Sequence, residues 1–214
     1  MIMKKTLVVL AVASLAGCAT RAKIDVPDTA QWKSPTLAGK TFAFDIYYSQ
    51  PTPGVFSGGD AQPLLPLNQV QTSVASADIV KQLPNYLAKK LPANAKAADG
   101  TTSDYVLRVE LVAPHKRGPA YSDYQAGQSI AMNLITLGLA PSYYNLVAEF
   151  DAKYVLTSQG QSIYEKSYKV KDLVADQRGD FDGFSILNQH TAELFQKHLF
   201  TTLDDFYSGA FANK

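Results

Sequence analysis

The chain has 214 residues, with 20 basic and 19 acidic side chains and a formal net charge of +1. This length corresponds to about one domain. The near-neutral charge argues against a nucleic-acid-binding protein, which usually has a clear basic excess. Hydrophobic residues make up 46% of the chain, which is enough to bury a core. The single cysteine excludes an intrachain disulfide framework and a cysteine-rich metal site.

Residues 1–17 have the pattern of a signal peptide. Lys4 and Lys5 form a short basic region, and residues 6–15 are mostly apolar. Ten residues are too few to cross a hydrocarbon core of ~30 Å as a helix, so this stretch is not a membrane span. The segment ends in an aliphatic residue, two small residues and the cysteine, in the order Leu15, Ala16, Gly17, Cys18.

This ending resembles the lipobox of bacterial lipoproteins. The resemblance implies cleavage between Gly17 and Cys18, a diacylglycerol on the Cys18 thiol and acylation of the new amine. Several acyl chains give stable anchoring, whereas one would be marginal. Ala19 resembles the residue found in cargo sent to the outer membrane of Gram-negative bacteria. For such a host we therefore expect the mature chain on the periplasmic leaflet of the outer membrane.

The mature chain is expected to begin with a tether over residues 18–40, which mix charge, proline and small residues. Alternation predicts a strand from residue 41 to 48. Residues 49–75 are rich in proline and glycine and are expected to form a loop. Residues 76–91 have helical spacing, although Pro84 should kink this helix or divide it.

The second half of the chain predicts three more strands and a helix. Alternation marks strands at residues 105–111, 146–156 and 162–170, the last two joined as a hairpin with one solvated face. Residues 171–182 are expected to form a charged loop. A helical apolar stripe then runs from residue 183 to 206.

These elements predict an α+β fold, with a mixed sheet of about four strands and two helices on one face. The order is β-α-β-(apolar insert)-β-β-α, with the first two strands parallel. We expect one periplasmic domain over residues 41–210, with an insert at 113–145. This layout resembles small, uncharacterised outer-membrane accessory lipoproteins of proteobacteria.

The insert carries the main candidate contact surface. Its apolar run at residues 130–139 predicts a short third helix packed under the sheet, or else an exposed element that touches lipid or a partner protein. Tyrosines flank the run and tolerate half-wet surfaces. The candidate partner or membrane contacts are Tyr121, Tyr124, Ile130, Leu134, Leu137, Tyr143 and Tyr144.

Few residues indicate catalysis or metal binding, and we expect no cofactor and no metal. His190 and Glu193 have a helical spacing that metal sites use, but solvent-facing or boundary histidines are the simpler interpretation, and the same holds for His198. His115 belongs to a basic turn at residues 114–119, which is either solvated or meets lipid phosphates. Three aspartates resemble a calcium loop only loosely, and a helix cap at Asp182 explains that residue more simply; they are Asp176, Asp180 and Asp182.

The sequence therefore favours a non-enzymatic, outer-membrane-anchored lipoprotein. Its expected role is that of an accessory or scaffold subunit binding an envelope protein partner. The alternative is a lipid- or glycan-binding module of the periplasm, which requires a pocket of roughly 300 Å³ or more. Catalytic motifs such as a nucleophile elbow or a phosphate loop are absent from the sequence, so we expect no enzyme.

Overall fold

The structure is a computed structural model that describes residues 21–27, 33, 37–54, 59–98, 103–179 and 181–211. The predicted signal peptide and its cleavage site, Gly17 and Cys18, lie outside these residues, as does Asp180.

One mixed sheet organises the described residues. Its central strand is the long β6, which pairs with β7 along its whole length on one side and with β4 and β5, end to end, on the other. β1 runs parallel to β4, as the sequence predicts, and also pairs with β2 and β3. The strands are β1 (Thr41–Ser49), β2 (Leu65–Pro66), β3 (Lys96–Ala97), β4 (Tyr105–Val112), β5 (Ala120–Tyr124), β6 (Ser142–Ser158) and β7 (Gln161–Arg178).

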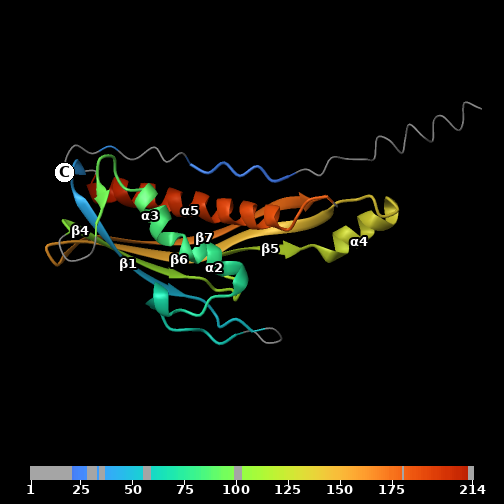
Figure 1. The fold of residues 1–214 in the computed structure, drawn as a ribbon, viewed down its shortest axis with the longest axis horizontal. Coiled ribbons are helices and arrows are strands. Elements are labelled where there is room, and N and C mark those ends of the chain that lie inside the picture. The colour runs from blue at the N-terminus through green and yellow to red at the C-terminus, as the bar shows by residue number, and fades with distance from the viewer. Residues whose placement is uncertain are drawn as a thin grey trace, which may run out of the picture.

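Three helices cover one face of this sheet (Figure 1). The helix predicted across residues 76–91 is divided, because Pro84 lacks an N–H and stands in the first turn of a new helix, where none is needed. The described helices are α2 (Val74–Lys81), α3 (Leu83–Lys89), α4 (Ala126–Ile135) and α5 (Ser185–Phe211), with a 3₁₀ turn η2 (Leu67–Gln69).

The core lies between the sheet and the helices α2, α3 and α5. Alternate residues of β6, from Leu146 to Leu156, are buried against α5, whose Leu194, Phe195 and Leu199 are fully covered. The opposite face of the sheet is polar and partly solvated, as expected of a half-buried antiparallel sheet. There, the Arg108 guanidinium lies 4.2 Å from the ring centre of Tyr47.

The sheet has more strands than the sequence predicts, although the α+β class is confirmed. β2 and β3 have two residues each, which is too short to produce a recognisable alternation. β5 lies within the predicted insert, so residues 113–145 are not one excursion from the sheet. The predicted third strand also begins earlier, at Ser142, which places Tyr143 and Tyr144 inside β6.

The predicted loop at residues 171–182 is wrong, because β7 continues to Arg178. Asp172 and Asp176 occupy positions of this strand that face α5, where carboxylates are unfavourable unless they find partners. α5 supplies them: His198 Nε2 lies 2.8 Å from Asp172, and His190 Nδ1 lies 2.7 Å from Asp176. This pairing across elements explains why local sequence alone points to a loop.

Residues 21–27, which the sequence assigns to the tether, run along the domain beside α5 (Figure 1). Ala22 and Ile24 pack against the core. The N–H of Ala22 donates to Asp176 at 2.7 Å, and the Arg21 guanidinium pairs with Asp182. The described part of this segment is therefore attached to the domain.

Candidate functional site

α4 presents a group of exposed apolar side chains. The helix forms as the sequence predicts, but the prediction that it packs under the sheet is wrong. α4 stands beyond the end of the sheet (Figure 1), and Ser129 is its one buried residue. We call the exposed group the apolar tip; its side chains are 58–91% exposed and comprise Ile130, Leu134, Ile135, Leu137 and Leu139.

The base of the apolar tip is held by the strands on either side of it. Ser129 Oγ accepts a hydrogen bond from the N–H of Tyr143 at 2.9 Å. The N–H of Gln125 donates to the carbonyl of Tyr143 at 2.9 Å, and the rings of Tyr124 and Tyr144 pack with centres 5.3 Å apart. The tip is therefore a fixed extension of β5 and β6.

The turn that follows α4 has an unusual residue, Leu137. The N–H of Gly138 donates to the carbonyl of Asn133 at 2.8 Å, which is the long hydrogen bond of a Schellman ending. In that motif the residue before Gly138 adopts left-handed backbone, a place usually taken by glycine. Leu137 has φ +56 there, and its side chain is 91% exposed. Neither backbone conformation nor burial explains a leucine at this position.

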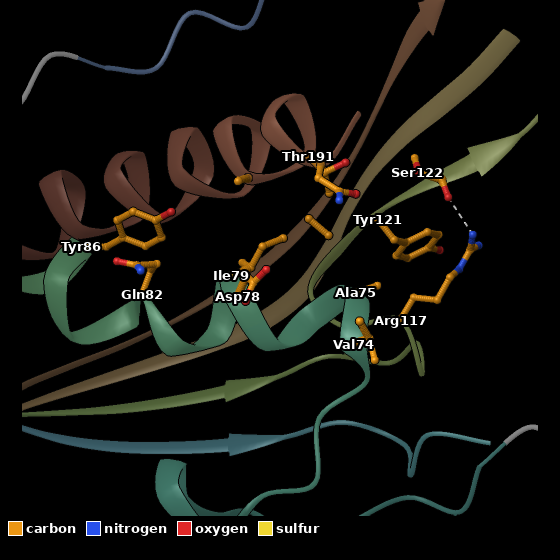
Figure 2. A pocket seen from close by; sticks show the side chains of 13 residues that line it. Val74, Ala75, Asp78, Ile79, Gln82, Tyr86, Arg117, Tyr121, Ser122 and Thr191 are labelled. Atoms are coloured by element: carbon orange, nitrogen blue, oxygen red, sulfur yellow. Dashed lines mark hydrogen bonds between the residues drawn. The ribbon is translucent and has the colours of Figure 1, made fainter. Parts of the chain in front are cut away.

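A groove of about 600 Å³ lies between α2, α5 and β5 (Figure 2). Val74 and Asp78 line it from α2, Gln82 lines it from the position after that helix, and Thr191 lines it from α5. Val74 is 94% exposed at its rim. Tyr86 closes one end, and burial raises the pKa of its phenol. The groove exceeds the volume that a small-molecule site requires.

One rim of the groove is a stacked cluster from the basic turn. The Arg117 guanidinium lies 4.1 Å from the ring centre of Tyr121, and the His115 ring stacks on Tyr121 at 4.3 Å. Burial is the main cause that lowers the pKa of His115. The basic turn is therefore packed against β5 and is not a freely solvated loop.

The turn reaches the groove because of Gly118. Its φ is +99, and a Cβ at this position would lie 2.3 Å from the Cβ of Ser76 in α2. Ser76 is itself buried, and its hydroxyl donates to Gln50 at 2.9 Å. Only glycine allows α2 and the turn to approach this closely.

β5 has a free edge beside the groove. The carbonyl of Pro119 and the N–H of Gln125 are hydrogen-bonded to β6. In an antiparallel pair, the backbone N–H and C=O groups of the odd-numbered residues between them therefore also point toward β6. The backbone N–H and C=O groups of the even-numbered residues point away from β6, and in the described residues no strand pairs with them. The carbonyl of Ser122 on this edge accepts a hydrogen bond from Arg117 at 2.7 Å.

His190 differs from the prediction of a solvent-facing or boundary histidine. It is buried, at 7% exposed, and paired with the buried Asp176. Glu193 instead accepts a hydrogen bond from Gln189. Among the described residues, no group of three or more histidine, cysteine or acidic side chains is placed to hold a metal ion.

Asp182 does not cap the last helix as predicted. The helix begins at Ser185, and the Asp182 carboxylate accepts a hydrogen bond from the N–H of Gly179 at 3.0 Å and pairs with Arg21. Its role is to join the N-terminal segment to the loop after β7.

The predicted contact residues do not form one surface. Tyr121 lines the groove, Tyr144 is buried, and Tyr124 and Tyr143 stand at the base of α4. The predicted tip residues are exposed on α4 and after it; they are Ile130, Leu134 and Leu137. The sequence analysis missed Val74 and Asp78 in the groove, because their exposure depends on where α2 lies. No described helix is long and apolar enough to cross a membrane.

Comparison with known proteins gives distant likenesses only. No protein-family profile and no curated protein sequence matches the chain. Among solved structures, a Xanthomonas campestris protein of family DUF330 has 11% identity and a TM-score of 0.37, covering 88% of this chain and 97% of that one.

Two further solved structures have similar scores. A Helicobacter pylori homologue of the neuraminyllactose-binding hemagglutinin has 8% identity and a TM-score of 0.39, covering 92% of this chain and 93% of that one. A minor lipoprotein from Acinetobacter baumannii has 11% identity and a TM-score of 0.37, covering 81% and 94%. At TM-scores below 0.5, these neighbours assign no function to the chain.

Proposed function

We propose that this chain is a non-enzymatic accessory lipoprotein that binds an extended segment of an envelope protein partner. The observation that carries the proposal is the groove of about 600 Å³ beside the free edge of β5. A sheet edge offers N–H and C=O groups to another chain, and side pockets then select the sequence that binds. On this edge the Ser122 carbonyl already accepts a hydrogen bond from Arg117, which leaves the Ser122 N–H for a partner.

The walls of the groove suit a peptide. Val74 and Ala75 supply exposed apolar surface, while Asp78 and Arg117 place opposite charges on α2 and on the basic turn (Figure 2). Charges at a rim set the direction and register of a bound segment more than its affinity. Arg117 is also held by Asp123 at 2.9 Å, so its position is fixed before the partner binds.

The histidines support a binding role over an enzymatic one. His190 and Asp176 form a pair that resembles part of a catalytic site, but the other Asp176 oxygen accepts from the N–H of Ala22. This pair therefore attaches the N-terminal segment to β7 and α5. A general base needs access to a substrate proton, whereas His190 is 7% exposed.

The envelope location rests on the lipobox at residues 15–18. Acylated Cys18 would hold the chain in the membrane, and Ala19 favours the periplasmic leaflet of the outer membrane in a Gram-negative host. Anchoring raises the local concentration of the domain near membrane-bound partners, which strengthens a modest interface.

In-cell photocrosslinking from position 74 tests the proposal. Val74 is exposed at the rim of the groove, and Gln161, at the far end of the sheet, is the matched exposed control. We expect a discrete protein adduct from position 74 and none from position 161. Equal labelling from both positions would contradict a partner site in the groove.

A second variant tests strand addition. Ser122→Pro removes an N–H on the edge that faces away from β6, so it leaves the pairing of β5 with β6 in place. The adduct from position 74 should disappear in this variant while the folded domain is retained in a urea titration. A persistent adduct would mean that the partner binds without pairing to β5.

The alternative of a lipid- or glycan-binding module draws on the same groove. Its volume lies within the range of small-molecule sites. A lipid or glycan adduct from position 74, in place of a protein adduct, would favour this alternative.

A further inference from the structure

We propose that the apolar tip inserts into the membrane leaflet that holds the acyl chains of Cys18, as a second attachment that orients the domain. This inference rests on the lipid anchor of the proposed function and assigns a role to a surface separate from the groove. The occupant is the lipid of that leaflet, reached by α4 and the turn that follows it.

The composition of the tip suits lipid. The sequence has no charged residue between Asp123 and Glu149, so the whole of α4 and the turn after it are uncharged. Charged side chains are the costly ones to move into a bilayer, and this segment has none. Tyr124 and Tyr143 stand at the base of the helix, where aromatic rings with a hydroxyl suit the level of the headgroups.

The apolar exposure is concentrated at one end of the molecule. Eight of the twelve large apolar side chains exposed in the described residues lie at the end of the sheet where α4 stands. They include Phe181 and Phe184 in the loop between β7 and α5, in addition to Tyr124 and the five residues of the apolar tip. Apolar surface gathered in this way usually marks a contact with lipid or protein.

The described chain begins at the same end. Arg21 pairs with Asp182, which lies next to Arg178, and Arg178 is the register partner of Ser142 at the foot of the α4 turn. Cys18 precedes Arg21 by three residues, and an extended chain spans at most about 3.6 Å per residue, so Cys18 lies within about 11 Å of Arg21. An acylated Cys18 would therefore attach near the end of the domain that carries the apolar tip.

Leu137 supplies an independent observation. It occupies left-handed backbone and is almost fully exposed, two conditions that favour glycine or asparagine. A residue that is unfavourable for folding in both respects is a reason to look for a function at that position. Insertion into hydrocarbon is a function that an exposed leucine can serve.

The test uses the lipidated full chain and a label on the tip. Acylation uses the Cys18 thiol, the only native one, so Leu137→Cys introduces a single free thiol for an environment-sensitive nitrobenzoxadiazole dye. The protein is reconstituted in phosphatidylethanolamine–phosphatidylglycerol vesicles containing doxyl-labelled lipid, which quenches dyes in the hydrocarbon. Gln161→Cys, at the opposite end of the sheet, is the control.

We expect the chain to float with the vesicles and the dye at position 137 to lose most of its fluorescence, with no loss at position 161. Adding Leu134→Asp should restore the fluorescence at position 137 without releasing the anchored chain. Flotation without lipid quenching at position 137 would overturn the inference and leave the anchor standing. A dye shielded from soluble iodide but not quenched by lipid would mean that protein covers the tip, which also overturns it.

A chain that does not float would overturn the lipid anchor of the proposed function and this inference together. Partner binding in the groove is measured separately from position 74. The failure of either proposal is therefore distinguishable from the failure of the other.

Discussion

Arg21, at the start of the described chain, forms an ion pair with Asp182 in the loop between β7 and α5. This contact leaves two residues, Ala19 and Thr20, between Arg21 and the predicted acylated cysteine. If Cys18 is acylated as proposed, a domain on so short a connection should stay close to the membrane, whereas a free tether over residues 18–40 would let it reach outward. An envelope partner of this domain should therefore present its binding segment near the membrane surface.

The attachment of the N-terminal segment should depend on Asp176. Replacing this buried carboxylate by alanine removes the acceptor for the N–H of Ala22 and the partner of His190. Leaving such groups unpaired costs about 1–3 kcal/mol each, so Asp176→Ala should lower the free energy of unfolding by about 2–6 kcal/mol. Urea titration monitored by circular dichroism measures this.

The control for that variant is Asp182→Ala. The ion pair with Arg21 is partly exposed, with Arg21 at 54% side-chain exposure, and surface pairs contribute about 0–1 kcal/mol. If both variants lowered stability equally, the buried His190–Asp176 pair would not be the main attachment.

A substitution at Leu137 should stabilise the apolar tip. Leu137→Asn places a residue that tolerates left-handed backbone at φ +56 and removes an exposed apolar side chain. We expect the free energy of unfolding to rise by about 1 kcal/mol, because left-handed backbone costs a branched side chain about that much. A fall in the free energy of unfolding of Leu137→Asn would contradict this account of Leu137.

The close approach of the basic turn to α2 should make Gly118 far more sensitive than Gly138. Both have positive φ, but a Cβ at Gly118 would meet Ser76 at 2.3 Å, whereas nothing lies within 4 Å of one at Gly138. Gly138→Ala should cost about 1 kcal/mol for its backbone alone. Gly118→Ala should cost about 1–3 kcal/mol more through overpacking, measured by urea titration.

A further readout of Gly118→Ala is the groove itself. Displacing the turn moves Arg117 away from Ser122, so the crosslink from position 74 should weaken in this variant and persist in Gly138→Ala. Equal crosslinking in the two variants would show that the rim does not position the partner.

Low pH should weaken the contacts of Asp104 with Lys40 and Thr41 at the start of β1. The Asp104 carboxylate accepts hydrogen bonds from Lys40 Nζ at 2.8 Å and from the Thr41 N–H and hydroxyl at 2.9 Å each. The hydrogen bond from Lys40, followed by those from Thr41, lowers the pKa of Asp104 to about 2. An unfolded aspartate has a pKa of about 3.9.

Because the folded pKa is the lower one, the stabilisation by Asp104 is complete above about pH 4 and disappears as the pH falls through 2. Asp104→Asn should therefore be less stable than the wild type by a constant amount from pH 8 to 5, and the difference should close below pH 4. A difference independent of pH down to 2 would contradict the charge-based account. Urea midpoints at each pH measure it.

Sequence periodicity predicted the strands whose inward faces are uniformly apolar. β4 and β6 alternate without interruption, and the solvated outer face follows from the same pattern. The end of β7 was missed because Asp172 and Asp176 face inward and are satisfied by histidines of α5, 26 and 14 residues away along the chain. Such long-range pairs leave no local pattern.

The environment of α4 could not be predicted from periodicity either. The apolar run at residues 130–139 could be either a helix packed under the sheet or an exposed element. Only the tertiary structure shows that Leu134 and Leu137 are exposed to solvent. Groove residues such as Val74 have no signal of their own, since they become a site only where α2 lies beside β5. The resemblance of residues 15–18 to a lipobox, by contrast, is a linear sequence pattern that can be found without a fold.

The most direct test of the account is the intact mass of the chain extracted from the membranes of a Gram-negative host. We predict a protein that begins at Cys18, lacks residues 1–17 and carries a diacylglycerol and an amide-linked acyl chain. Cys18→Ala should abolish this species. A membrane-extracted chain that retains residues 1–17, or a mature chain without acyl mass, would contradict the anchor and the orientation derived from it.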